Sequence, residues 1–407
     1  MGRNGAAIFD ISNNTIYAID QEIGRIIAAC KRGIQIKEYL SKVSPRKRAL
    51  IVDYMVDLIN KEIGFINNTY IVTEVLFPSW SKEFKRLDNK AIEMDVLQLE
   101  IFNICNLDCI HCYADNAEIS RCSCSRAKEE NKYVKGISLT LLKSALRDAS
   151  RLKCNELYIL GGEPLLNRAR LFEIVKAAYK CIPNIRVLTN MMLIDEDIIN
   201  LCKEYGIKLE TNFYSHRSYI QDQITHIEGS WKKWIVNCKR VIKGRIPIKA
   251  NIEILNINKG DIQDGYNLLR DIGVENISYK LVYSQKEWPD KTGDLLYKKI
   301  ADIRGVSKDT FFSNIERNPC WYGKVAVTYC GNIQPCIMAR SYSMGNLTEC
   351  RLIELFRKNR ILEYWLNSKD KIDKCKHCEF RYSCSDCRPI ESINNTLSGE
   401  NKYCRIY

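Results

Sequence analysis

Between residues 95 and 284 the sequence alternates regularly between short apolar runs and amphipathic helical stretches. The runs with the length and residue types of buried strands are Val96–Phe102, Glu156–Leu160, Ile185–Thr189, Ile207–Tyr214, Pro247–Ile254 and Asn276–Val282. Such alternation predicts parallel strands that are joined by right-handed helical crossovers. We therefore expect an α/β fold, a partial (β/α)6 barrel or an open parallel sheet, in which the chemistry takes place at the C-terminal ends of the strands.

Three cysteines, Cys105, Cys109 and Cys112, follow the first of these strands in the stretch ICNLDCIHCYAD. The chain has 19 cysteines and no segment with the form of a signal peptide or a membrane span. We therefore expect a cytoplasmic protein whose thiols bind metal rather than form disulfides. A structural zinc ion would take the three thiolates and His111 as its four ligands. A four-iron cubane held by three thiolates would instead keep one iron open to another ligand.

A second candidate site ends the next predicted strand, in the stretch LYILGGEPLL. Gly161 and Gly162 have no side chain, so that a ligand can approach the backbone closely. Glu163 offers a carboxylate to an ammonium group, and Pro164 suits the first turn of a helix. An ordinary strand-to-helix turn is the alternative interpretation of this stretch.

The two motifs, in this order on consecutive strands, resemble those of the radical S-adenosylmethionine superfamily. The resemblance implies that the three cysteines hold a four-iron, four-sulfur (4Fe–4S) cluster, whose open iron binds the methionine end of S-adenosylmethionine. Electron transfer from such a cluster breaks a sulfonium S–C bond and yields a 5′-deoxyadenosyl radical. The residues that the resemblance places at the cofactor are Gly161, Gly162, Glu163, Pro164, His111, Asn190 and Asn212.

The two asparagines are the least specific members of this set. Asn190 and Asn212 lie near the ends of the third and fourth predicted strands, where a turn residue is the alternative interpretation of each. Family members often have Thr-Asn-Gly at the end of the third strand, whereas this chain has Met191 at the position of the glycine.

Nine more cysteines lie between residues 320 and 404. Taken alone, the Cys-x-x-Cys pairs of CKHCEFRYSCSDC would fit a zinc ribbon. Their whole order resembles the SPASM extension of radical enzymes, which carries two auxiliary 4Fe–4S clusters. The resemblance assigns the outer cluster to Cys375, Cys378, Cys384 and Cys404, and the inner cluster to Cys320, Cys336 and Cys387. The fourth position of the inner cluster has two alternatives: Cys330 is the ligand, or one iron has no protein ligand. The gap from Cys384 to Cys387 is one residue shorter than is usual in the family.

Residues 1–88 predict a separate small domain. Two apolar runs, AIFD and TIYAID, form an expected hairpin, and FINNTYIV is the expected closing strand. The helical stretches between them are Gln21–Cys30, Ile36–Leu40 and Arg46–Lys61. This order is typical of a winged helix, and it resembles the domains that capture leader peptides in enzymes that mature ribosomally made peptides. A winged helix for DNA is the alternative, but 13 Lys and Arg against 10 Asp and Glu leave little charge for phosphates.

The sequence thus predicts a winged-helix-like peptide-recognition domain (1–88), a radical S-adenosylmethionine partial barrel (89–315) and a SPASM auxiliary-cluster domain (316–407). The resemblance implies an enzyme that uses S-adenosylmethionine and three 4Fe–4S clusters to modify a precursor peptide with a leader sequence. A thioether or other crosslink is the leading product, and formylglycine, made by an anaerobic sulfatase-maturing enzyme, is the alternative. A cluster-containing DNA-binding regulator is the alternative from another class of protein. A flavodoxin or ferredoxin is the expected electron donor, and neither a membrane nor nucleic acid is an expected partner, although the net charge is +13.

Overall fold

The computed structural model describes residues 2, 5–10, 15–31, 35–60, 93–112, 136–282, 302–303, 306–385, 387–391, 396–399 and 404. Its main feature is a nine-stranded sheet with the strand order β12-β11-β10-β3-β4-β5-β6-β7-β8. The parallel strands at its centre are β3 (Val96–Phe102), β4 (Glu156–Gly161), β5 (Asn184–Leu188), β6 (Lys208–Phe213), β7 (Ile248–Ile254) and β8 (Asn276–Leu281). The predicted α/β fold is therefore confirmed, and each of these strands lies within one residue of its predicted bounds.

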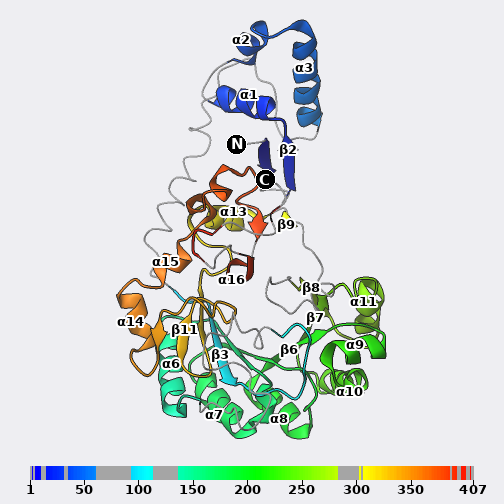
Figure 1. Cartoon of the computed structure of the whole chain (residues 1–407), viewed down its shortest axis with the longest axis vertical. Coiled ribbons are helices and arrows are strands. Elements are labelled where there is room, and N and C mark those ends of the chain that lie inside the picture. The colour runs from blue at the N-terminus through cyan, green and yellow to red at the C-terminus, as the bar shows by residue number, and fades with distance from the viewer. Residues whose placement is uncertain are drawn as a thin grey trace.

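Helices cover one face of this sheet (Figure 1). They are α6 (Leu139–Arg151), α7 (Arg168–Tyr179), α8 (Glu196–Tyr205), α9 (Ser218–Thr225), α10 (Ser230–Lys243) and α11 (Ile262–Asp271), with a short 3-10 helix, η3 (Pro164–Leu166), after β4. In α6, the hydroxyl oxygen of Ser138 caps the first turn by accepting from the Leu141 amide (3.3 Å). The buried stripe of this helix is Leu142, Ala145, Leu146 and Ala149. This spacing puts one apolar face of the helix against the sheet.

The C-terminal segment extends the same sheet. Strand β10 (Lys324–Val327) pairs in parallel with β3, and β11 (Asn332–Gln334) and β12 (Gly345–Asn346) follow in antiparallel order. The fully buried Arg340 forms an ion pair with Glu100 of β3, which also accepts from the Tyr329 amide (2.9 Å). Arg340 and Glu100 are buried charges that pair across the boundary between the C-terminal segment and the central sheet. The two parts therefore pack as one body.

The rest of the C-terminal segment consists of short elements. They are β9 (Asp302–Ile303), α13 (Lys308–Glu316), α14 (Leu352–Arg357), α15 (Leu362–Trp365), η4 (Lys369–Lys371), η5 (Cys375–His377), β13 (Cys384–Ser385) and α16 (Arg388–Glu391). None of the helices in the described part of the chain is long and apolar enough to cross a membrane.

The N-terminal segment has the predicted order of a hairpin followed by three helices. These elements are β1 (Ala6–Asp10), β2 (Thr15–Ile19), α1 (Gln21–Lys31), α2 (Ile36–Ser41) and α3 (Pro45–Asn60). They enclose a small core of their own, made by Ala6, Ile19, Ile23, Ile26, Ile51 and Leu58. The predicted closing strand FINNTYIV lies outside the described residues, so the winged-helix assignment stays a prediction. Figure 1 shows this segment at one end of the long axis, beside the C-terminal segment.

Candidate active site

The three cysteines of the first motif lie in the loop after β3, at the C-terminal edge of the parallel strands. Cys105, Cys109 and Cys112 are each partly exposed. The amides of Asp108 and Ile110 donate to carbonyl groups in the last turn of α9 (3.0 Å each), which fixes the middle of the loop. We call residues 103–112 the cysteine loop.

Nitrogen donors surround the first of these sulfur atoms. The Sγ atom of Cys105 lies 3.5 Å from the amide nitrogen of Leu107 and 3.6 Å from Nδ2 of Asn190. N–H groups that point at sulfur stabilise a thiolate, and they are one of the ways in which proteins tune iron–sulfur clusters.

Gly161 and Gly162 lie directly against the cysteine loop. The amide of Gly162 donates to the carbonyl oxygen of Phe102 (2.9 Å), and the amide of Glu163 donates to that of Ile104 (2.8 Å). A Cβ atom at Gly161 would collide with the carbonyl group of Phe102, and one at Gly162 would collide with that of Ile104. The glycine pair is therefore needed for two backbone segments to meet, and this contact fixes the start of the cysteine loop.

Replacing Gly162 by Ala is expected to destabilise the protein by about 3 kcal/mol, because the new Cβ has no room against fixed backbone. The change should appear as a lower midpoint of urea unfolding and as a lower yield of reconstituted cluster. Gly260→Ala is the matched control, since its Cβ would meet nothing within 4 Å. Equal midpoints for the two variants would show that the contact with the loop does not matter.

Glu163 is fully buried, and its carboxylate accepts three hydrogen bonds. The donors are the amide of Leu165 (3.0 Å), the hydroxyl of Thr189 (2.8 Å) and the amide of Asn190 (2.7 Å). Burial raises the pKa of Glu163 to about 7, and these donors oppose a further rise. A carboxylate has about four acceptor positions, so the protein itself occupies most of them. Glu163 thus ties the start of η3 to the end of β5.

Glu163→Gln is expected to weaken S-adenosylmethionine binding about tenfold, which is about 1.4 kcal/mol, with the cluster content unchanged. One acceptor oxygen becomes an NH2 group, which would face an N–H donor and leave it unsatisfied. Isothermal titration of S-adenosylmethionine into cluster-loaded protein measures the effect. Glu228→Gln, at an exposed position, is the control. If Glu163→Gln binds as tightly as this control, Glu163 has no part in the site.

The two candidate asparagines differ in position. Nδ2 of Asn190 donates to Oδ1 of Asn106 (2.7 Å), so Asn190 joins the end of β5 to the cysteine loop. Oδ1 of Asn212, within β6, accepts from Nδ2 of Asn251 on the neighbouring strand (3.3 Å). The structure therefore brings Asn190 to the cysteine loop, whereas it brings Asn212 to β7.

Met191 adopts the backbone conformation that glycine would favour. Its φ is 70°, in the left-handed region, and its side chain is fully buried. A side chain in this region costs about 1 kcal/mol, a cost that a glycine at this position does not have. Nδ2 of Asn237 donates to the Met191 carbonyl oxygen (2.6 Å) and holds the turn. Met191 therefore adopts the left-handed conformation in spite of its side chain.

Tyr214 is a residue of this site that the sequence reasoning missed. Its hydroxyl lies 3.4 Å from Nε2 of His111 and 4.0 Å from Sγ of Cys109, and the two rings meet edge to face at 5.2 Å. Burial lowers the pKa of His111 to about 4, so the imidazole is neutral, and burial raises the pKa of Tyr214 well above its usual value. The position of Tyr214 just after β6 was the available signal, because that edge carries the chemistry.

Five cysteines of the C-terminal motif lie in two groups. Burial raises the pKa of Cys336 to about 12, and the charge of neighbouring Cys320 adds to this rise. Burial likewise raises the pKa of Cys378, and the charges of neighbouring Cys384 and Cys404 contribute. The structure thus brings together two residues predicted for the inner cluster and three predicted for the outer one.

The other candidate cysteines lie close to these groups along the chain. Cys375 begins η5, and Cys387 immediately precedes α16. Sγ of Cys330 lies 3.4 Å from the hydroxyl of Thr328 and 3.6 Å from Nδ2 of Asn332, in the turn between β10 and β11. Among the described residues, no three His, Cys, Asp or Glu side chains are placed to hold a metal ion. A single metal ion needs its ligands around one point, whereas the thiolates that hold a cubane bind different irons of the cluster.

A buried lysine supports an anionic group at the outer cysteines. Lys369 is 2% exposed, and its Nζ atom lies 3.8 Å from Sγ of Cys384. An ammonium group close to a cysteine stabilises the negative charge of its thiolate, whether the thiolate is free or bound to a cluster. The donor set at this position therefore fits an iron–sulfur cluster.

Comparison with known families agrees with both motifs. Residues 99–269 match the Radical SAM superfamily, and residues 320–379 match SPASM, an iron–sulfur cluster-binding domain. The first match contains the cysteine loop and the Gly-Gly-Glu-Pro turn. The second begins at Cys320 and contains Cys375 and Cys378.

Two curated relatives illustrate how much of the chain is shared. The antilisterial bacteriocin subtilosin biosynthesis protein AlbA of Bacillus subtilis (strain 168) is 21% identical over 333 residues, which cover 75% of this chain and 68% of AlbA. A probable GTP 3′,8-cyclase of Methanosarcina mazei is 25% identical over 199 residues, which cover 48% of this chain and 56% of the cyclase. The chain thus spans only about half of the cyclase.

Solved structures share the fold at low sequence identity. SuiB of Streptococcus suis has a TM-score of 0.59 and 13% identity, and the match covers 100% of both chains. The structure of anSMEcpe with bound AdoMet and Cp18Cys peptide has a TM-score of 0.57 and 15% identity, over 76% of this chain and 93% of that one. Residues 99–269 are therefore a radical SAM domain and residues 320–379 a SPASM iron–sulfur domain, and the chain that carries both is an enzyme.

Proposed function

We propose that this enzyme modifies a ribosomally made precursor peptide, and that the product is a thioether or another crosslink. The observation that carries the proposal is the likeness to SuiB over the full length of both chains, the N-terminal segment included. A SuiB structure with bound precursor peptide SuiA has a TM-score of 0.55 and 13% identity over 94% of this chain. AlbA, which acts in the biosynthesis of the bacteriocin subtilosin, supports the same class of substrate.

In this proposal Cys105, Cys109 and Cys112 hold the 4Fe–4S cluster, and Asn190 orients the first of these thiolates. The backbone of Gly161 and Gly162 fixes the loop that carries them. When bound, the cluster and S-adenosylmethionine supply a 5′-deoxyadenosyl radical that removes one hydrogen atom from the substrate. The residues of the site limit the access of water to that radical, since Tyr214 is 7% exposed and His111 is half-buried.

Two auxiliary clusters complete the proposed set of three. The outer cluster takes Cys375, Cys378, Cys384 and Cys404 as ligands, and the inner cluster takes Cys320, Cys336 and Cys387, with Cys330 as the candidate for the fourth position. Joining a sulfur atom to a carbon removes two hydrogen atoms from the peptide. The radical would take one of them, which would leave one electron and one proton, and an auxiliary cluster would supply an acceptor for that electron.

Residues 1–88 are proposed to bind the leader of the precursor, because an edge strand of the hairpin can pair with an extended peptide. The proposed catalytic partial barrel (89–315) and the SPASM domain (316–407) then act on the core of the same peptide. A flavodoxin or ferredoxin is proposed as the electron donor.

Mass spectrometry of the precursor after incubation with the enzyme tests the proposal. A crosslink removes hydrogen atoms only, whereas formylglycine formation from cysteine also replaces the sulfur by oxygen. Formylglycine is the second candidate product because anSMEcpe has a similar fold. Its match leaves 24% of this chain uncovered, whereas the match to SuiB leaves none, and this difference favours the crosslink. A precursor that gains oxygen and loses sulfur would overturn the crosslink.

A further inference from the structure

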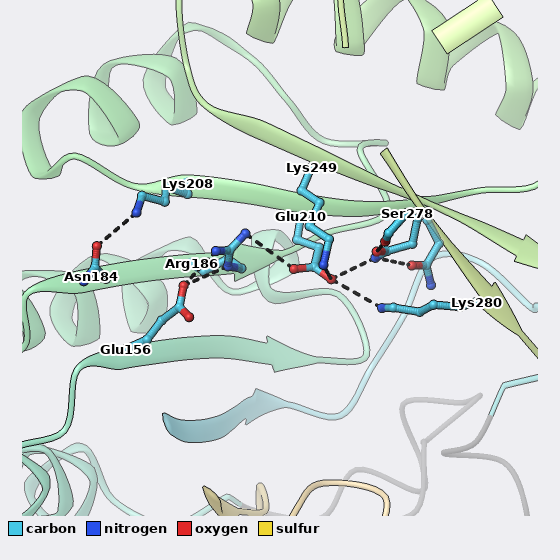
Figure 2. A network of polar contacts seen from close by, with 10 residues as sticks. Glu156, Asn184, Arg186, Lys208, Glu210, Lys249, Ser278 and Lys280 are labelled. Carbon is cyan, nitrogen blue, oxygen red and sulfur yellow. Dashed lines mark hydrogen bonds and ion pairs between the residues drawn. The ribbon is translucent and has the colours of Figure 1, made fainter. Parts of the chain in front are cut away.

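The sheet face opposite the helices carries a row of charged and polar side chains, which we call the charged row (Figure 2). Alternate side chains of a strand point to opposite faces, and Thr211 of β6 faces the helices, because its hydroxyl accepts from Nε1 of Trp234 in α10 (3.1 Å). From β4 to β8 the members of the charged row are Glu156, Asn184, Arg186, Lys208, Glu210, Lys249, Asn251, Ser278 and Lys280. Since a charge inside a fold is costly without a partner, the pairing within this row decides what else it can bind.

Glu210 is the centre of the charged row, with a side chain that is 4% exposed. Its Oε1 accepts from Nδ2 of Asn251 (2.8 Å) and lies 3.3 Å from Nζ of Lys280 and 3.7 Å from Nζ of Lys249. Its Oε2 lies 3.6 Å from a guanidinium nitrogen of Arg186. Burial would raise the pKa of Glu210, but Asn251 and the three cations together lower it. One ionised carboxylate therefore faces three cations.

The remaining members of the row do not restore the balance of charge. Arg186 has a second partner in Glu156, at 2.8 Å. Lys208 donates to Oδ1 of Asn184 (3.0 Å), which is a neutral group. The charged row thus contains four cations and two carboxylates, so it carries a net positive charge.

Two other carboxylates of the described sheet, Glu253 on β7 and Glu100 on β3, leave the excess charge of the row in place. Burial raises the pKa of Glu253, near the end of β7, to about 7, although Lys280 opposes the rise. Burial therefore weakens the negative charge that Glu253 contributes beside Lys280. Glu100 on β3 is already paired with the buried Arg340 of the C-terminal segment. The positive end of the row lies on β7 and β8.

The cations at that end are accessible. The side chain of Lys249 is 26% exposed and that of Lys280 is 44% exposed, whereas their common partner Glu210 is buried. Both ammonium groups approach the same oxygen atom of Glu210, so they converge. Lys280 pairs in register with Glu253, one residue before the C-terminal end of β8. That is the edge of the sheet at which the cysteine loop begins.

We propose that Lys249 and Lys280 bind a carboxylate side chain of the peptide substrate. The enzyme then selects peptides that have an acidic residue close to the residue that it modifies. Two convergent ammonium groups offer several N–H donors to one carboxylate, and charge-assisted hydrogen bonds of this kind are strong. This inference rests on the proposed function and adds the chemical class of the substrate. The methionine carboxylate of S-adenosylmethionine is a second source of the same group, and the experiment separates the two.

The test uses the full-length, cluster-loaded enzyme with S-adenosylmethionine and two fluorescein-labelled probe peptides. Both are 12-residue Gly-Ser peptides with one central Cys, and they differ only in two flanking positions, which are Glu in one and Gln in the other. Fluorescence anisotropy should show that the Glu probe binds about tenfold more tightly than the Gln probe. Lys249→Met/Lys280→Met should remove this preference, and Lys249→Glu/Lys280→Glu should favour a third probe with Lys at the same positions. Lys239→Glu/Lys259→Glu, at two exposed positions, is the matched control for net charge.

Equal binding of the Glu and Gln probes to the unmodified enzyme would overturn the inference. An unchanged preference for the Glu probe in both Lys249/Lys280 variants, the Met and the Glu variant, would also overturn it. A separate titration of S-adenosylmethionine without peptide should give the same affinity for the unmodified enzyme and the Met variant. A loss of that affinity, with the peptide preference intact, would assign the lysines to the cofactor and contradict the inference. Circular dichroism and cluster absorbance identify a misfolded variant. Formation of 5′-deoxyadenosine without peptide tests the family chemistry independently of either peptide proposal.

Discussion

Replacing Cys105, Cys109 and Cys112 together by Ala is expected to abolish the formation of 5′-deoxyadenosine. Anaerobically reconstituted enzyme should hold about twelve irons, and the triple variant should hold about eight. The loss is expected to be complete because these thiolates are the proposed ligands of the cluster that binds S-adenosylmethionine. Iron analysis and chromatography of the reaction products measure the two effects.

The control for this experiment is a pair of cysteines outside every proposed cluster. Cys202 and Cys238 are buried, and burial raises the pKa of each to about 12, so they act as small apolar residues. Cys202→Ala/Cys238→Ala should keep about twelve irons and the activity, with a loss of stability of about 1 to 3 kcal/mol. Zinc in place of iron in the unmodified protein would contradict the assignment of all three clusters.

The central sheet could be predicted from the sequence because its signal is local. Strand β3 begins at Val96 and ends at Phe102, as expected, since a parallel strand between covered faces is a short apolar run with clear ends. The order of the strands followed from the helices between them, because right-handed crossovers leave few arrangements. The hairpin and the three helices of the N-terminal segment were predictable for the same reason.

The contacts of the site were harder to predict because they join distant parts of the chain. Gly162 was expected to make room for a ligand, but its nearest neighbour is the backbone of the cysteine loop. Glu163 was expected to offer its carboxylate to an ammonium group, but three donors of the protein already occupy it. Tyr214 lies about a hundred residues from Cys109 in the sequence, and only the folded chain brings them together. The charged row likewise exists only when β4 to β8 are aligned in register.

Deletion of residues 1–88 is expected to separate peptide recognition from radical chemistry. The N-terminal segment has its own apolar core, and none of the proposed cluster ligands lies in it. Reductive cleavage of S-adenosylmethionine without peptide should therefore survive the deletion. Modification of the full-length precursor should fall about a hundredfold or more, because the tethered leader raises the effective concentration of the core peptide. Adding the excised segment in trans should restore only part of this rate.

The contact between the N-terminal hairpin and the C-terminal segment decides how this deletion is interpreted. The rings of Phe9 in β1 and Phe311 in α13 lie 4.9 Å apart, and Phe311 also meets the ring of Tyr382 at 5.4 Å. Deletion exposes Phe311, so cluster absorbance must be equal in the full-length and shortened proteins before rates are compared. Phe9→Ala keeps the whole segment but loosens this contact, and it should lower the modification rate less than the deletion does. A shortened, cluster-loaded enzyme that modifies the full-length precursor at the intact rate would show that residues 1–88 do not bind the leader.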